Sequence, residues 1–119
     1  MNVAELKDRI SAHGAAVIAG DRTGASFVIP AKLESWRTGA AALENLRPLS
    51  DCELMAFARI GQHFMAKTRF HGRDGAVTLL IRWKETDGKW MIADAEDITG
   101  KRSPWSDIPH YSKEGGTNA

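Results

Sequence analysis

The chain has 119 residues, 43% of them hydrophobic, so it is long enough for one hydrophobic core and too short for two. Its 16 basic and 15 acidic residues leave a formal charge of +1, which argues against a nucleic-acid backbone or a membrane surface as the main partner. The single cysteine, Cys52, excludes an internal disulfide and any metal site made of several cysteines.

The N-terminal segment favours a cytoplasmic protein without a membrane partner. Charged residues begin at Glu5, so the apolar run of a secretory signal is missing. Nowhere do apolar residues fill the roughly 18 consecutive positions of a membrane span. A lone cysteine also suits a reducing compartment.

A helix is predicted at the start of the chain. Asn2 and Glu5 have the spacing of a helix N-cap and its reciprocal partner, and the predicted helix ends at Gly20-Asp21. Apolar residues recur on it at three- and four-residue steps, which indicates one buried stripe. The stripe consists of Val3, Leu6, Ile10, Val17 and Ile18.

The next segments give shorter and less regular patterns. A second helix is predicted from residue 21 to about 28, where Pro30 ends it, because the residue before a proline is pushed out of helical geometry. Residues 31–37 fit a short strand. A small helix is predicted over 39–46, closed by Pro48.

In the second half of the chain the apolar period changes to two, which is typical of strands. Residues 53–71 predict one long strand, bent near Gly61. A second strand is predicted over 76–85 and a third over 89–98, joined by a tight Asp87-Gly88 turn. The expected fold is therefore α+β, with a three-stranded antiparallel meander packed on N-terminal helices.

Hairpin closure at these turns fixes which residues face each other across the strands. Trp83 is expected between Phe64 and Ile92, and Ile81 is expected opposite Asp94. The inner face so defined, which the helices must cover, consists of Gln62, Phe64, Ala66, Thr68, Phe70, Val77, Leu79, Ile81, Trp83, Ile92, Asp94, Glu96 and Ile98.

Two carboxylates, Asp94 and Glu96, fall on this otherwise apolar face. An unpaired carboxylate among apolar side chains costs several kcal/mol or is protonated, so the pair requires an explanation. Acids in such surroundings serve in proton transfer. The alternative is that the end of the strand leaves the core, so that both acids meet solvent or an arginine.

Several segments together resemble the nuclear transport factor 2-like superfamily over about residues 3–105. The most specific is the hairpin 80–92, LIRWKETDGKWMI, with a tryptophan two residues after Asp-Gly, followed by EDIT at 96–99. The first helix ending at Gly20-Asp21 and the GAAAL helix at 39–43 also fit. The resemblance implies a cone, in which a curved antiparallel sheet wraps around helices and leaves one pocket, and it makes residues 1–105 one domain with an irregular tail at 106–119.

The superfamily includes SnoaL-like cyclases, ketosteroid isomerases, epoxide hydrolases and binding modules without chemistry. In SnoaL-like enzymes an acid on a late strand accepts the proton, and Asp94 matches that position. Ketosteroid isomerases need a tyrosine deep in the pocket, whereas the one tyrosine here is Tyr111 in the tail. The epoxide hydrolases use an Asp-Arg-Asp arrangement. Arg59 is the nearest candidate for its arginine, but strand parity puts Arg59 on the opposite face. The predicted catalytic residues are Asp94, Glu96 and His63, and the predicted pocket residues are Phe64, Thr68, Ile81, Trp83 and Ile92.

The four histidines, His13, His63, His71 and His110, lack the spacing of a metal site, so neither a metal nor another cofactor is expected. His13 is expected at the edge of the first helix's apolar stripe. His63 falls on the outer face by parity, and only a bulge at Gly61 would turn it inward beside Asp94.

The outer face of the predicted sheet mixes charges with apolar residues. The charged residues Lys67, Arg69, Arg82 and Lys84 would suit an anionic partner, whereas Met65, Leu80 and Met91 would suit a homodimer interface. No aromatic residues for base stacking lie among them, so no nucleic-acid partner is expected.

Three functions fit these observations. The first is a pocket protein for a small apolar or aromatic molecule, with an isomerase or cyclase activity that uses Asp94 as general base. The alternative is a non-catalytic dimerisation or ligand-binding module, in which the acids only satisfy buried polar groups. The third is an adaptor that binds an anionic partner through its outer face.

Overall fold

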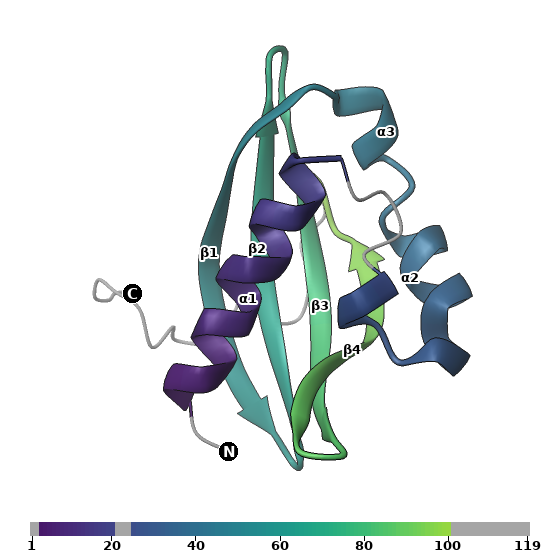
Figure 1. Cartoon of the computed structure of the whole chain (residues 1–119). Coiled ribbons are helices and arrows are strands. Elements are labelled where there is room, and N and C mark those ends of the chain that lie inside the picture. Colours follow the sequence, from purple (N-terminus) through teal and green to yellow (C-terminus); the bar gives the residue numbers. More distant parts are fainter. Residues whose placement is uncertain (1–2, 21–24, 101–119) are drawn as a thin grey trace.

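The computed structural model describes residues 3–20 and 25–100 (Figure 1). Its elements in chain order are α1 (Val3–Ile18), the 3₁₀ turns Ala25–Phe27 and Pro30–Lys32, α2 (Leu33–Gly39), α3 (Leu43–Leu46), β1 (Leu49–Ile60), β2 (His63–Gly72), β3 (Ala76–Thr86) and β4 (Lys89–Asp97). The predicted tail at 106–119, with His110 and Tyr111, lies outside the described residues. Among the described helices, none has the length and apolar character needed to cross a membrane.

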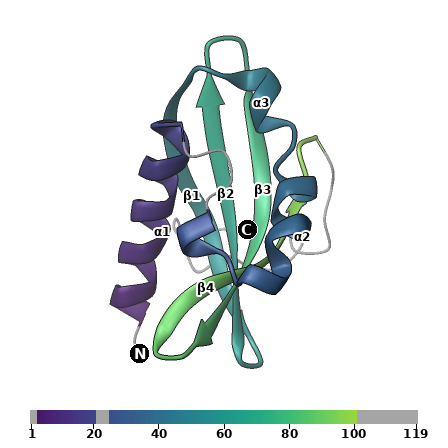
Figure 2. The ribbon, with the colours of Figure 1, turned by 45° about the vertical axis from the view of Figure 1, so that its right-hand side comes forward.

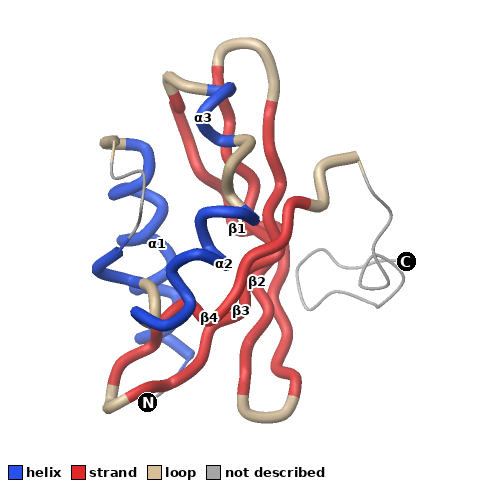
Figure 3. Tube along the Cα trace, turned by 90° about the vertical axis from the view of Figure 1, so that its right-hand side faces the viewer, coloured by secondary structure: helices blue, strands red, loops and turns tan. Residues whose placement is uncertain are grey.

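The strands form one antiparallel sheet in the order β1-β2-β3-β4. The sheet is open, with β1 and β4 at its edges. Helix α1 packs on β1 and α2 packs on β4, so the helices cover one face of the sheet (Figures 2 and 3). The predicted α+β class, with helices before an antiparallel sheet, is confirmed.

The expected three-stranded meander is in fact four-stranded. Residues 53–71 do not form one bent strand, because the chain reverses at Gly61-Gln62 and separates β1 from β2. Gly61 has φ +63°, a left-handed conformation that glycine adopts without steric cost. A glycine inside a strand-like pattern indicates either a bend or a turn, and here it makes a hairpin.

The predicted helix boundaries need correction between the end of α1 and the sheet. In the segment expected to form a second helix, residues 25–27 form a 3₁₀ turn, after which Val28 pairs with Ile92 in an isolated parallel bridge. Residues 31–37, expected as a strand, belong to a 3₁₀ turn and to α2, because Trp36 and Ala40 bury one helical side against the sheet. The helix expected over 39–46 begins only at Leu43.

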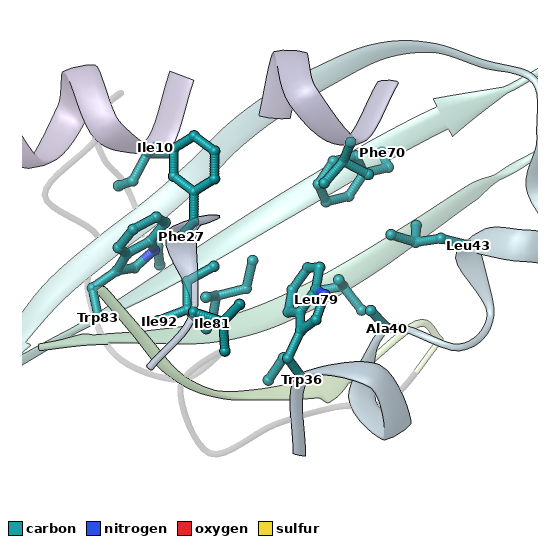
Figure 4. Close-up of a cluster of buried hydrophobic side chains, with 14 of the residues drawn as sticks. Ile10, Phe27, Trp36, Ala40, Leu43, Phe70, Leu79, Ile81, Trp83 and Ile92 are labelled. Atoms are coloured by element: carbon teal, nitrogen blue, oxygen red, sulfur yellow. The ribbon is translucent and has the colours of Figure 1, made fainter. Parts of the chain in front are cut away.

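The core lies between the inner face of the sheet and the helices (Figure 4). The predicted register is confirmed at its centre, since Trp83 faces Phe64 on one side and Ile92 on the other. Trp83 and Trp36 are both fully buried.

His13 is also part of this core and is not at its edge. Its imidazole is 1% exposed and makes edge-on contacts with three aromatic rings, those of Phe27, Trp36 and Trp83, at centroid distances of 5.4, 4.9 and 5.8 Å. The helical spacing from Ile10 to His13 to Val17 is the sequence signal for this position.

Candidate functional site

The predicted acidic pair does not lie on the inner face. In β4 the register shifts by one residue, because Trp83 faces Ile92 but Arg82 faces Asp94, which leaves Ala93 as a bulge. An extra residue reverses the alternation of side chains beyond it. Asp94 and Glu96 are therefore exposed, and the buried Ala95 takes the inner position opposite Ile81.

Asp94 instead makes a surface contact between α2 and β4. Ser35 Oγ donates a hydrogen bond to Asp94 Oδ1 at 2.6 Å, and the same oxygen accepts from the backbone N–H of Ala95 at 2.9 Å. Because Asp94 is exposed, the argument from burial that made it a candidate base is lost. Its catalytic role stays a prediction that rests on the resemblance alone.

Glu96 lines an open groove between α2 and β4 with a volume of about 510 Å³. The other residues along it are Glu34, Ser35, Thr38, Gly39, Ala95 and Asp97. In the described part of the chain, no group of three or more His, Cys, Asp or Glu side chains is placed to hold a metal ion.

His63 lies on the outer face, where parity placed it. It faces Lys84 across β2 and β3, and Gly61 forms the turn instead of a bulge that would rotate the histidine inward. Partial desolvation lowers the pKa of His63 below its ordinary value of 6.5, and the nearby charges of Arg82 and Lys84 lower it further. Asp94 faces Arg82, in a different cross-strand row, so the structure does not pair His63 with Asp94.

Most of the predicted pocket residues are core residues. Thr68, Ile81, Trp83 and Ile92 are between 0% and 2% exposed, so their surfaces are covered by the rest of the chain. Phe64, from the predicted set, lines a cavity. The role of the other four residues in a pocket stays a prediction.

That cavity lies at one end of the sheet and has a volume of about 380 Å³, within the range of small-molecule sites. The start of α1, the β1–β2 turn and the β3–β4 turn lie together at this end (Figure 1). We call it the end cavity. It is lined by Val3, Arg59, Gln62, Phe64, Lys84, Glu85 and Trp90.

Two aromatic rings form the apolar part of the end cavity. Phe64 and Trp90 are 8% and 6% exposed, and their rings meet edge to face at 5.5 Å. Arg9 of α1 fixes the position of Trp90, because its Nε donates a hydrogen bond to the Trp90 carbonyl oxygen at 3.1 Å. The buried indole Nε1 of Trp90 has no hydrogen-bond partner among the described residues.

Arg59 reaches the cavity through the β1–β2 hairpin. The turn at Gly61-Gln62 pairs Ile60 with His63 and Arg59 with Phe64, so Arg59 is not on the outer side that the parity of one continuous strand predicts. The guanidinium carbon of Arg59 lies 5.9 Å from the centre of the Phe64 ring, and its Nε donates to the carbonyl oxygen of Gly61 at 3.1 Å.

Gln62 was expected on the inner face, but no sequence pattern grouped it in one site with Arg59, Lys84, Glu85 and Trp90. Trp90 could have been found, since it has the same parity as Ile92 in the last strand. Arg59 was expected on the outer face because the sequence pattern predicts one strand over residues 53–71, whereas the turn at Gly61-Gln62 pairs it with Phe64.

Comparison with protein-family models, with curated proteins and with solved structures finds no match to this chain.

Proposed function

We propose that the protein binds a small apolar or aromatic molecule in the end cavity. The observation that carries this proposal is the pair of buried rings, Phe64 and Trp90, at the wall of a cavity of about 380 Å³. Aromatic rings prefer edge-to-face or offset contacts at separations of roughly 4.5–7 Å, and the two rings offer such contacts to a planar ligand. The hydrogen bond from Arg9 holds Trp90 in place before a ligand arrives, which lowers the entropic cost of binding.

Membership of the nuclear transport factor 2-like superfamily is part of the same proposal. Two features support it: the helices precede an antiparallel meander, and a cavity lies at one end of the sheet. An isomerase or cyclase activity with Asp94 as general base is a separate proposal, which rests on the resemblance alone. Binding in the end cavity does not need it, since Asp94 does not line this cavity.

A titration followed by ¹H–¹⁵N NMR tests the binding function with an uncharged probe, 2-naphthalenemethanol. We expect shifts at the indole N–H of Trp90 and at the amide of Phe64. Replacing either residue by leucine keeps apolar volume but removes the ring, and should weaken binding by about three- to tenfold.

The matched control for this titration is Asp94→Asn, which changes an exposed side chain outside the end cavity and should leave the affinity unchanged. If the shifts instead gather around Ser35 and Asp94, and Asp94→Asn removes them, the ligand lies at the α2–β4 groove and the proposal is wrong.

The second proposal is a homodimer formed through the outer face. Met65 and Leu80 lie there in neighbouring cross-strand rows and are partly exposed among charged residues. Met91, the third residue expected in this patch, has its sulfur 3.4 Å from Arg9 Nη2 of α1, so the patch is smaller than the sequence suggested.

Light scattering at tens of micromolar should give twice the chain mass of 13.0 kDa, and Leu80→Lys should return the monomer. A monomer for the unaltered chain would contradict this proposal.

A further inference from the structure

The polar groups of the end cavity are mostly hydrogen-bond donors. Arg59 and Lys84 bring two positive charges to its lining, against one negative charge from Glu85. Within the described residues neither cation has a carboxylate partner, whereas Arg47 elsewhere is paired with Glu44 at 3.2 Å. The cavity therefore carries unneutralised positive charge.

The guanidinium of Arg59 is held by one hydrogen bond, in which its Nε donates to the Gly61 carbonyl oxygen. Its two terminal Nη groups have no acceptor in the part of the chain that the structure describes. A guanidinium fixed in this way can receive both oxygens of a carboxylate in a bidentate pair. Its position over the Phe64 ring places these donors beside the aromatic wall.

Trp90 contributes its ring to the wall of the end cavity and not a further donor. Its indole Nε1 is covered by other atoms of the chain, so a ligand in the cavity does not reach it.

The positive charge of Lys84 also acts on His63, its cross-strand neighbour on the outer face. The charges of Arg82 and Lys84 add to desolvation in lowering the pKa of His63, so a further positive charge is disfavoured there. An anion is favoured by the same field.

We propose that the ligand of the end cavity is an aromatic or apolar acid, whose ring packs on Phe64 and Trp90 while its carboxylate is bound by Arg59 and Lys84. This inference rests on the proposed function and narrows it to a class of ligand. The class follows from the charges at the cavity, where two cations, Arg59 and Lys84, stand against the one carboxylate of Glu85.

Three probes with the same ring test the inference at pH 7.5 and low ionic strength: 2-naphthoate, 2-naphthalenemethanol and 2-naphthylmethylammonium. Affinities are measured with the 119-residue chain by the NMR titration described above. We expect the carboxylate to bind about tenfold more tightly than the alcohol, and the ammonium to bind most weakly.

Variants then assign the charge recognition to residues. Arg59→Met and Lys84→Met should each reduce the affinity for naphthoate by about tenfold and change that for the alcohol by less than about twofold. Arg59→Lys should recover only part of the loss, because an ammonium cannot form the bidentate pair. Arg73→Met is the matched control, since it removes one positive charge from an exposed turn outside the end cavity.

The results with the three probes distinguish a failure of the acid proposal from a failure of the proposed binding function. If the alcohol binds at the end cavity and the three probes have equal affinity, the acid proposal is overturned and the binding function stands. An equal loss of naphthoate affinity in Arg73→Met would also overturn it, because net charge alone would then explain the preference. If none of the three probes shifts Trp90 or Phe64, the binding function itself is overturned. Lys84 is exposed, so Lys84→Met provides the test even if Arg59→Met does not fold.

Discussion

Gly39→Ala should destabilise the fold by about 3 kcal/mol or more, because the added methyl group has no room between α2 and β4. A Cβ atom at Gly39 would overlap the carbonyl oxygen of Ala95. These are backbone atoms of a strand, so no rotation of a side chain can relieve the overlap. Helix α2 would have to move away from β4, which would also disturb the hydrogen bond from Ser35 to Asp94.

Urea-induced unfolding measures the effect of Gly39→Ala, with Gly75→Ala as the control. A Cβ at Gly75 would meet only a side-chain carbon of Leu46 at 3.9 Å, an ordinary contact, so we expect a change within about 1 kcal/mol. Equal stability of the two variants would mean that α2 does not sit on β4 as the structure shows.

Trp83→Ala should cost about 3–5 kcal/mol, as for other large aromatic side chains removed from a core. Trp83 is 0% exposed and packs between Phe64 and Ile92 on the two neighbouring strands. Its ring also meets the edge of His13 at 5.8 Å, so the vacated space would loosen contacts on both the sheet and α1.

The same unfolding experiment with Trp83→Phe provides the comparison. The indole N–H of Trp83 has no hydrogen-bond partner among the described residues, so phenylalanine loses volume but no hydrogen bond. We expect a loss below about 2 kcal/mol for this variant. A loss under about 1 kcal/mol for Trp83→Ala would contradict the central register of the sheet.

Turn chemistry and alternation were enough to predict the central part of the sheet from the sequence. The Asp87-Gly88 turn, where both residues have positive φ, sets the register of β3 and β4 next to the hairpin. The alternation of apolar residues then places Phe64, Trp83 and Ile92 on one face, and the structure agrees. These features depend on a few neighbouring residues, so local physical chemistry determines them.

The candidate site was decided by tertiary structure. The hairpin turn at Gly61-Gln62 brings Arg59 opposite Phe64 at the end cavity, and the bulge at Ala93 turns Asp94 and Glu96 away from the core. A bulge inserts one unpaired residue, and its place depends on how the strands twist and where the helices press on the sheet. Gly39 of α2 lies so close to the β4 residue facing it that this residue must be small. The bulge at Ala93 places Ala95 there. Alternation along a single strand contains no information about such a contact between distant segments. The sequence by itself therefore determined the β3–β4 hairpin and the apolar residues beside it, whereas the packing of the helices on the sheet determined which way the side chains of β4 point beyond Ile92.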